Sequence, residues 1–253
     1  LHTKRDGSDY VVPGLGVPKG LDAFYPVYQE GLLHGGSSQR QLAATAVGEL
    51  VELTDPKALR PCLVKLTGTL IRVVGDKHSA EVKAAILGSL NKILTKGGDM
   101  LRPFLPQLST SMVRCLQDPA ASVRRVAGDG LGKVMALSKR VDPIVNEVLN
   151  NIGTTMGGIK ESMTAALKEV LQHAGAKLTP TMRSKAVEAL LPLLVDVDDV
   201  VRAVAAAAAG AFLPHLEQEE AQPLLDFVNN TGGVADELAA STASAGSSVP
   251  ALG

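Results

Sequence analysis

One block of residues recurs five times along the 253-residue chain. Each copy has an apolar residue, a basic residue, two variable positions, and small or apolar residues three and seven places after the basic one. The clearest copy reads VRRVAGDGLG from Val123 to Gly132. Offsets of three, four and seven mark one face of an α-helix, so each copy predicts an amphipathic helix. The basic residues, called the basic row below, are Arg40, Lys83, Arg124, Lys160 and Arg202, separated by 43, 41, 36 and 42 positions.

A second helical pattern precedes each block, often with proline in its first turn, where the missing amide proton costs little. Pro61, Pro103 and Pro143 illustrate this. The expected first helices are about Leu21–His34, Leu59–Val74, Leu101–Gln117, Asp142–Asn151 and Pro180–Val195. The expected second helices are about Ser38–Leu53, Ser79–Thr95, Ala120–Ser138, Gly158–His173 and Asp198–Leu213, with a lone partial helix near Gln218–Val228.

A helical hairpin that recurs about every 40 residues is typical of HEAT or armadillo units, which bury their apolar faces by stacking on neighbours. Two helices per repeat favour HEAT over the three-helix armadillo form. The sequence therefore predicts an all-α fold, a right-handed α-solenoid of about five HEAT repeats plus a partial sixth. The array should span residues 19–230, with repeats at about 19–55, 56–97, 98–139, 140–176 and 177–214 and a partial repeat at 215–230. Glycines inside the helices, which cost up to about 1 kcal/mol each against alanine, predict close contact between helices.

The two ends of the chain depart from this pattern. Residues 1–18 are expected to form an extended arm packed on a neighbouring repeat absent from this chain. The Ala/Ser/Gly-rich segment 231–253 has no aliphatic periodicity to oppose its conformational entropy and is expected to be disordered. Because the first residue is Leu1 and no signal segment follows, we expect a fragment of a longer protein.

Composition excludes several functional classes. The 25 basic and 26 acidic side chains give a net charge of −1, and aromatic residues make up only 3% of the chain, which argues against direct sequence-specific nucleic-acid binding. No apolar run approaches the ~20 residues that span a bilayer, so we expect no membrane partner. The two cysteines, Cys62 and Cys115, show no CxxC or Cys/His clustering, which argues against a disulfide framework and a zinc module. A reducing compartment fits this usage, and we expect a cytoplasmic location.

No catalytic, cofactor or metal site is predicted. The five histidines never fall at metal-ligand spacing. The GDGLGK stretch at Gly128–Lys133 departs from a phosphate loop at Ala127 and Val134 and lies inside a predicted helix. Asp196, Asp198 and Asp199 resemble half of a calcium loop, but helix capping explains them better.

The basic row admits two interpretations. Its members could pair with aspartates at the preceding turns, namely Asp76, Asp118, Asp196 and Asp198, and so tie adjacent repeats together. Alternatively, some members could face an acidic surface of a partner, where arginine makes bidentate contacts that lysine cannot. The candidate partner-binding residues are Arg124, Arg125, Lys83 and Lys160, with Arg124-Arg125 the strongest.

Four sequence segments are more specific than the HEAT consensus: LTGTLIRVVGDKHSAEVKAAIL at Leu66–Leu87, LRPFLPQL at Leu101–Leu108, LQDPAASVRRVAGDGLGKV at Leu116–Val134 and VDPIVNEVL at Val141–Leu149. From about Gly20 to Leu216 the chain resembles the general control nonderepressible protein one family. That resemblance implies a ribosome-associated HEAT scaffold that activates the kinase of translation initiation factor two alpha in amino-acid starvation. It further implies the C-terminal segment that binds the kinase's RWD domain.

The resemblance also suggests a contact residue. The family's kinase-contact arginine lies in the VR..A...LG block, a position that Arg124 occupies here, whereas Arg125 departs from the family pattern. Arg124→Glu is therefore expected to abolish capture of the RWD domain while helical circular dichroism persists.

Two other functions fit a HEAT array. A tubulin-binding TOG-like array has about this length, although such modules usually carry tryptophan in the turn of the first repeat and this chain has none. Other protein-interaction scaffolds, including those of membrane transport, share the fold, which alone assigns no function. An enzymatic HEAT protein such as a bilin lyase would need an acid/base constellation that the sequence does not show.

Overall fold

Helices in two parallel rows make up the protein, for which the computed structural model describes residues 15–17, 19–75 and 77–230. The α-helices are α1 Tyr25–His34, α2 Ser37–Leu53, α3 Pro56–Val73, α4 Ala80–Gly97, α5 Leu105–Cys115, α6 Ala121–Leu137, α7 Asp142–Thr154, α8 Gly157–Ala174, α9 Pro180–Leu194 and α10 Asp199–Phe212. Short 3-10 turns occupy Gly20–Ala23, Gly98–Phe104, Gly175–Lys177 and Leu213–His215. Residues 218–230 are also helical.

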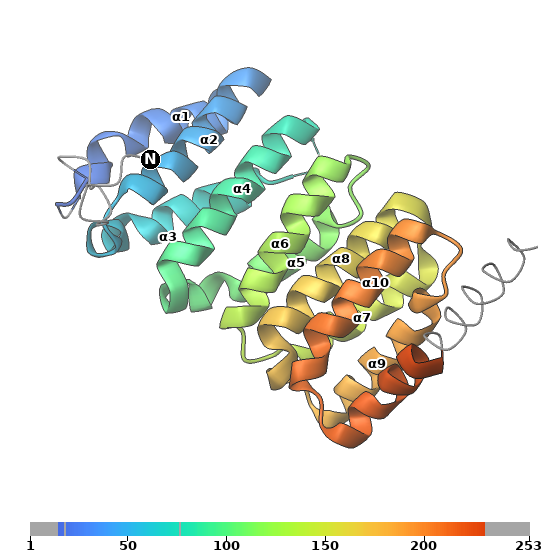
Figure 1. Ribbon diagram of the computed structural model, residues 1–253. Helices are drawn as coiled ribbons and strands as arrows, with labels where there is room; N and C mark the ends of the chain where they lie inside the picture. Colours follow the sequence, from blue (N-terminus) through green and yellow to red (C-terminus); the bar gives the residue numbers. More distant parts are fainter. Residues whose placement is uncertain (1–14, 18, 76, 231–253) are drawn as a thin grey trace, which may run out of the picture.

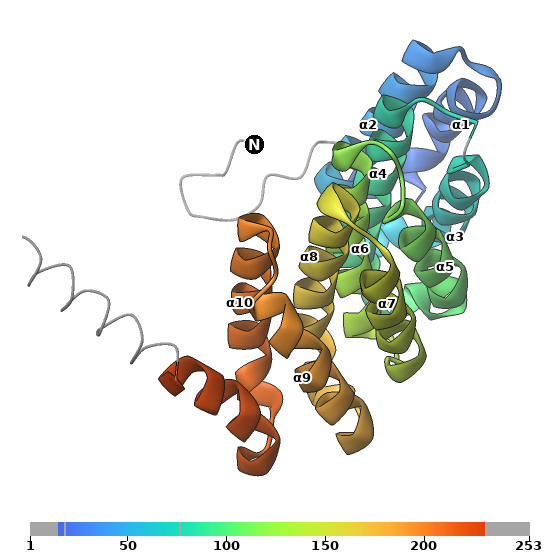
Figure 2. The same ribbon diagram turned by 90° about the vertical axis from the view of Figure 1, so that its right-hand side faces the viewer.

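The even-numbered helices lie side by side in one row, and the odd-numbered helices form a second row behind them (Figures 1 and 2). Each odd-numbered helix pairs with the even-numbered helix that follows it, which is the stacked hairpin of a HEAT repeat. The predicted all-α solenoid of HEAT type is therefore confirmed within the described residues. No helix among them is long and apolar enough to cross a membrane.

The buried core is aliphatic and follows the predicted helical face. The residues three places after the basic row, among them Ile86, Ala127 and Met163, are all buried, and so are those seven places after it, among them Leu90 and Leu131. These residues belong to one continuous apolar cluster running through the described repeats.

Glycine brings α6 and α8 close together. A Cβ atom on Gly128 would lie 3.3 Å from the Cβ of Ala166, and one on Gly132 would lie 2.9 Å from the Cβ of Glu169. The predicted role of helix glycines in close contact is confirmed at these positions. It is wrong for Gly68, where an added Cβ would meet no atom within 4 Å, and Gly88 is equally open.

Some predicted boundaries shift. The helix expected at Leu101–Gln117 starts as a 3-10 turn and becomes α-helical only at Leu105, because Pro103 disfavours the helical conformation of the preceding residue and Pro106 suits a first turn. Leu15, in the expected arm, is buried in this chain's own core, and its carbonyl oxygen accepts a hydrogen bond from the Asp55 amide at 3.3 Å. That part of the arm packs on this chain, contrary to the expectation of an absent repeat. The rest of the arm and the expected disordered tail lie outside the described residues.

Candidate functional site: the turn edge and the α6–α10 groove

The turns that join the two helices of each repeat lie along one edge of the array, called the turn edge below (Figure 1). The links between successive repeats lie along the opposite edge. The basic row sits in the first turns of the even-numbered helices, so its side chains converge on the turn edge.

The arginines of the row fasten turns within their own repeat. Arg124 donates from Nη1 to the carbonyl oxygens of Asp118 and Pro119 at 2.9 and 2.8 Å, and from Nε to Ser162 Oγ of the next repeat at 2.9 Å. Arg202 Nη1 likewise donates to the carbonyl oxygens of Asp196 and Val197. These donors satisfy carbonyl groups that the turn leaves without a helical partner.

Arg40 does the same in the first repeat. Its Nε and Nη2 donate to the carbonyl oxygens of Leu32 and Leu33, at the end of α1, at 2.7 and 3.0 Å. A planar guanidinium can reach two carbonyl groups at once, which a lysine ammonium does less well.

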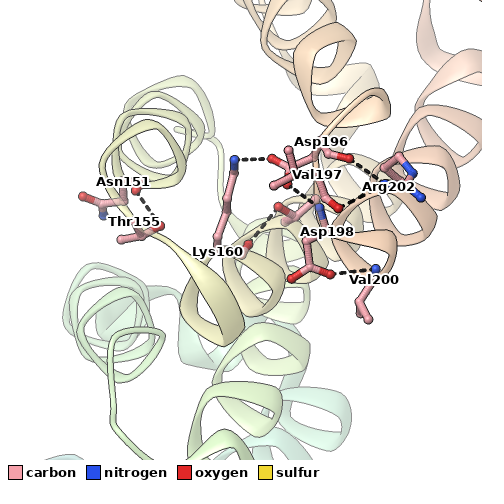
Figure 3. A network of polar contacts seen from close by, with 9 residues as sticks. Asn151, Thr155, Lys160, Asp196, Val197, Asp198, Val200 and Arg202 are labelled. Atoms are coloured by element: carbon pink, nitrogen blue, oxygen red, sulfur yellow. Dashed lines mark hydrogen bonds and ion pairs between the residues drawn. The ribbon is translucent and has the colours of Figure 1, made fainter.

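The lysines of the row reach into the following repeat. Lys83 on α4 pairs with Asp118, with 2.5 Å between Nζ and Oδ2, and Lys160 on α8 pairs with Asp196 in the same way. The other carboxylate oxygen of each aspartate accepts a backbone amide, from Ala120 at 2.9 Å and from Asp198 at 3.0 Å. Figure 3 shows this arrangement around Lys160 and Asp196.

The two aspartates therefore occupy equivalent turns, each held by a lysine from the preceding repeat and an arginine from its own. The hydrogen bond from Lys160, followed by the one from the Asp198 amide, holds the pKa of Asp196 below its ordinary value. The Asp196 carboxylate thus stays charged to a lower pH than an ordinary aspartate, and the pair ties two repeats together.

The structure separates the four predicted partner-binding residues. Arg124 is only 8% exposed, and Lys83 and Lys160 are engaged with the next repeat, so these three fit the interpretation as structural ties. Arg125 is exposed beside them. Of the aspartates proposed as partners, Asp198 caps α10 through the Val200 amide, at 2.9 Å, whereas Asp76 lies outside the described residues.

Sequence reasoning missed two features. Arg183 Nε on α9 donates to both carboxylate oxygens of Glu220, at 3.0 and 2.8 Å, which holds the helical residues 218–230 against the array. The sequence signal for this pair was its spacing of 37 positions. It also missed apolar side chains on the turn edge: Met156 is 87% and Val197 98% exposed. Their positions in turns were visible in the sequence, but their exposure was not.

A groove next to the turn edge crosses three even-numbered helices. It has a volume of about 550 Å³ and is called the α6–α10 groove below. Its floor consists of small residues, including Ala165, Ala166 and Ala207, while Arg125, Glu161 and Lys168 supply charges of both signs. Such a shallow surface of mixed charge suits contact with a protein.

Reactive chemistry is not apparent in the described ranges. They contain no group of three or more histidine, cysteine, aspartate or glutamate side chains placed to hold a metal ion. Cys62 and Cys115 are both buried. Burial raises the pKa of the Cys62 thiol, which disfavours the thiolate that a nucleophile requires.

Comparison with known proteins points to one family. Residues 142–246 match the model of the stalled ribosome sensor GCN1-like HEAT repeats. The chain is 39% identical over 227 residues to protein ILITYHIA of Arabidopsis thaliana and 41% identical over 216 residues to the human stalled ribosome sensor GCN1. It is 33% identical over 225 residues to the eIF-2-alpha kinase activator GCN1 of Saccharomyces cerevisiae. These matches cover 90%, 85% and 88% of this chain but only 8% of each relative.

Solved structures match at low identity. An engineered protein has a TM-score of 0.53 at 17% identity, over 74% of this chain and 78% of that one. A second match is a structure from crescerin, which uses a TOG domain array to regulate microtubules in the primary cilium. Its TM-score is 0.50 at 18% identity, over 90% of this chain and 91% of that one. These likenesses show the solenoid fold alone.

Proposed function

Because this chain is a HEAT-repeat segment of the GCN1-like family, a family of scaffolds in translational control, we propose that it is a noncatalytic module that binds the RWD domain of the initiation-factor-two-alpha kinase. In this proposal the segment acts in the cytoplasm and meets the ribosome through the longer protein to which it belongs. The name of the yeast relative, a kinase activator, supports the kinase as partner.

The surface that carries the proposal is the α6–α10 groove with the adjoining turn edge. Arg125 lies at its rim, and the exposed Met156 and Val197 supply apolar anchors on neighbouring turns. Interfaces draw most of their binding energy from a few residues, among which arginine is enriched, so an exposed arginine beside exposed apolar side chains fits a protein partner. The Lys160 to Asp196 tie holds those two turns in a fixed relation (Figure 3).

Arg124 has an indirect role in this proposal. Its guanidinium is committed to two turn carbonyls and to Ser162, so we assign it the task of positioning the start of α6, on which Arg125 sits. We therefore expect Arg124→Glu to disturb the start of α6 as well as binding, because a carboxylate there faces two carbonyl oxygens and loses every one of these hydrogen bonds.

A binding experiment tests the proposal. The chain and the purified RWD domain are titrated by calorimetry, with Arg125→Glu and Val197→Asp as test variants and Arg60→Glu as control. Arg60 is exposed on α3, in the other row of helices. We expect each test variant to weaken binding by about tenfold or more and the control to bind as wild type. If the wild-type chain does not bind, the RWD domain is not its partner. If both test variants bind as wild type, the α6–α10 groove and the turn edge are not the binding surface.

Tubulin remains the alternative partner, and no feature of the turn edge favours it. The turn of the first repeat consists of Gly35 and Gly36, so it lacks the tryptophan that TOG-like modules usually carry. Co-sedimentation of the chain with tubulin would reverse this choice.

A further inference from the structure

A basic cleft lies on the edge opposite the turn edge. It opens between the first turn of α5, the end of α6 and the start of α7, with a volume of about 560 Å³. Its floor is apolar and is formed by Leu105, Pro106, Leu137, Pro143 and Ile144. We call it the α5–α7 cleft.

The cleft coincides with an irregularity in the array. The step from Arg124 to Lys160 is the shortest in the basic row, at 36 positions. Here the first helices of two successive repeats, α5 and α7, barely touch, whereas α7 and α9 pack together. The odd-numbered row is therefore most open at this boundary, where apolar side chains line the cleft.

All the charged residues that line the cleft are basic. Its rim carries Arg102, Lys139 and Arg140, and none of its lining residues is acidic. The other large grooves among the described residues mix both signs, and the whole chain carries a net charge of −1. Arg102 is paired with Asp99 at 3.0 Å, but the side chains of Lys139 and Arg140 are exposed and make no hydrogen bond or ion pair within the part of the chain described.

Hydrogen bonds within the protein hold the backbone of one wall of the cleft in place before any ligand binds. Lys177 donates to the carbonyl oxygens of Met135, Ala136 and Ser138, and so holds the end of α6 and the link that carries the two free cations. Within the link, Ser138 Oγ and the backbone of Arg140 exchange two hydrogen bonds of 3.1 Å.

The polar groups of the floor are also satisfied. The Ser109 and Thr110 hydroxyls donate to carbonyl oxygens of their own helix. A partner thus meets an apolar floor and two unpaired cations whose backbone is already held, so only the cations' side chains have to be ordered on binding.

We propose that the α5–α7 cleft binds a linear peptide segment in which apolar side chains are flanked by acidic residues. The apolar side chains enter the floor, and the carboxylates reach Lys139 and Arg140. A cleft of this size takes a few side chains rather than the face of a folded domain. The proposal does not depend on the kinase, because the α6–α10 groove is a separate surface: α6 is the one helix that lines both, and it contributes its start to the groove and its end to the cleft.

The test uses fluorescence anisotropy with the full 253-residue chain and a fluorescein-labelled peptide, DELDDFEDLE. Two control peptides separate the contributions: DESDDSEDSE removes the apolar side chains, and KKLKKFKKLK reverses the charge. We expect the first peptide to bind about tenfold or more tightly than either control, with affinity that falls as salt rises. Equal binding of either control peptide would overturn the proposal, since it would reveal only charge or only apolar attraction.

Variants locate the site. The Lys139→Glu/Arg140→Glu double variant should reduce affinity about tenfold or more. Pro106→Glu places a carboxylate at the floor, in the first turn of α5 where helices favour negative charge, so it should keep the fold and weaken binding. Arg125→Glu, on the opposite edge, is the control and should bind as wild type. Unchanged affinity in folded cleft variants, or an equal loss in Arg125→Glu, would place the peptide elsewhere and overturn the proposal.

Discussion

Lys83 of the second repeat and Asp118 of the third form an ion pair in which each side chain is only about one-tenth exposed, at 11% and 9%. Removing the lysine alone leaves a partly buried carboxylate without its countercharge. We therefore expect Lys83→Met to lower the free energy of local opening at the α5–α6 turn by about 1–3 kcal/mol. Hydrogen exchange of the amides of Gln117, Asp118 and Ala120 measures this directly, because it reports on local opening.

A more exposed pair supplies the control. Lys92 and Glu52 also join adjacent repeats, at 2.9 Å, but they are 35% and 47% exposed. Lys92→Met should change the free energy of local opening around Glu52, near the end of α2, by less than about 1 kcal/mol. If the two substitutions had equal effects, burial would not explain the strength of the Lys83 pair.

Arg124 should resist replacement even by lysine. A lysine keeps the charge but cannot contact two turn carbonyls and Ser162 together. Arg124→Lys is expected to lower the stability of the α5–α6 turn by about 1–3 kcal/mol, measured by hydrogen exchange. Arg125→Lys, one position away and exposed, should stay within about 0.5 kcal/mol of wild type. Similar stabilities for the two variants would contradict the positioning role of Arg124.

Gly130 should be intolerant of alanine. A Cβ atom there would overlap Asn91 Oδ1 and lie 2.8 Å from the sulfur of Met112, so Gly130→Ala forces the packing of α4 and α5 on α6 to shift. We expect a loss of about 1–3 kcal/mol, seen as a lower urea midpoint. Gly68→Ala is the matched control: its Cβ meets open space, and the better helix propensity should raise stability by up to about 1 kcal/mol. Destabilisation by both substitutions would point to a backbone effect instead of crowding.

Acid should loosen the last described helix. The hydrogen bond from Arg183, assisted by the Glu217 amide, holds the pKa of Glu220 below its ordinary value of 4.5. The folded state thus favours the carboxylate, so the contact stabilises residues 218–230 above that ordinary value and is lost as pH falls through the lowered pKa. Hydrogen exchange of this helix between pH 6 and 3, corrected for intrinsic rates, should show increasing opening below about pH 4.5.

Glu220→Gln tests the assignment. Since glutamine does not titrate, this variant should open more readily at pH 6 and lose the acid-dependent part of the opening. An acid response equal to that of wild type would assign the effect to another carboxyl group.

The recurrence of apolar residues sufficed to predict the solenoid, because stacked hairpins bury the same helical face in every repeat. Residues such as Ile86 and Leu131 show that agreement, since both their offsets and their burial follow one period. The hydrogen-bond partners of the basic row were harder to predict from the sequence. Spacing alone could not show that Arg124 contacts carbonyl groups of its own turn while Lys83 crosses to the next repeat, because that depends on side-chain length and turn geometry.

The two surfaces were beyond sequence reasoning for a different reason. The α5–α7 cleft arises where α5 and α7 barely touch, and the separation of two helices depends on the packing of the whole array rather than on either helix. The unusual step of 36 positions was visible in the sequence, but its structural result was not.

That short step has a broader consequence. In an array of similar units, neighbouring surfaces resemble one another, so a binding protein could slide from one register to the next. The repeat that follows Arg124 breaks this equivalence, since the described steps on either side of it are 41 and 42 positions long. The array therefore has one position that differs from its neighbours, and a ligand that recognises this position binds in a single register.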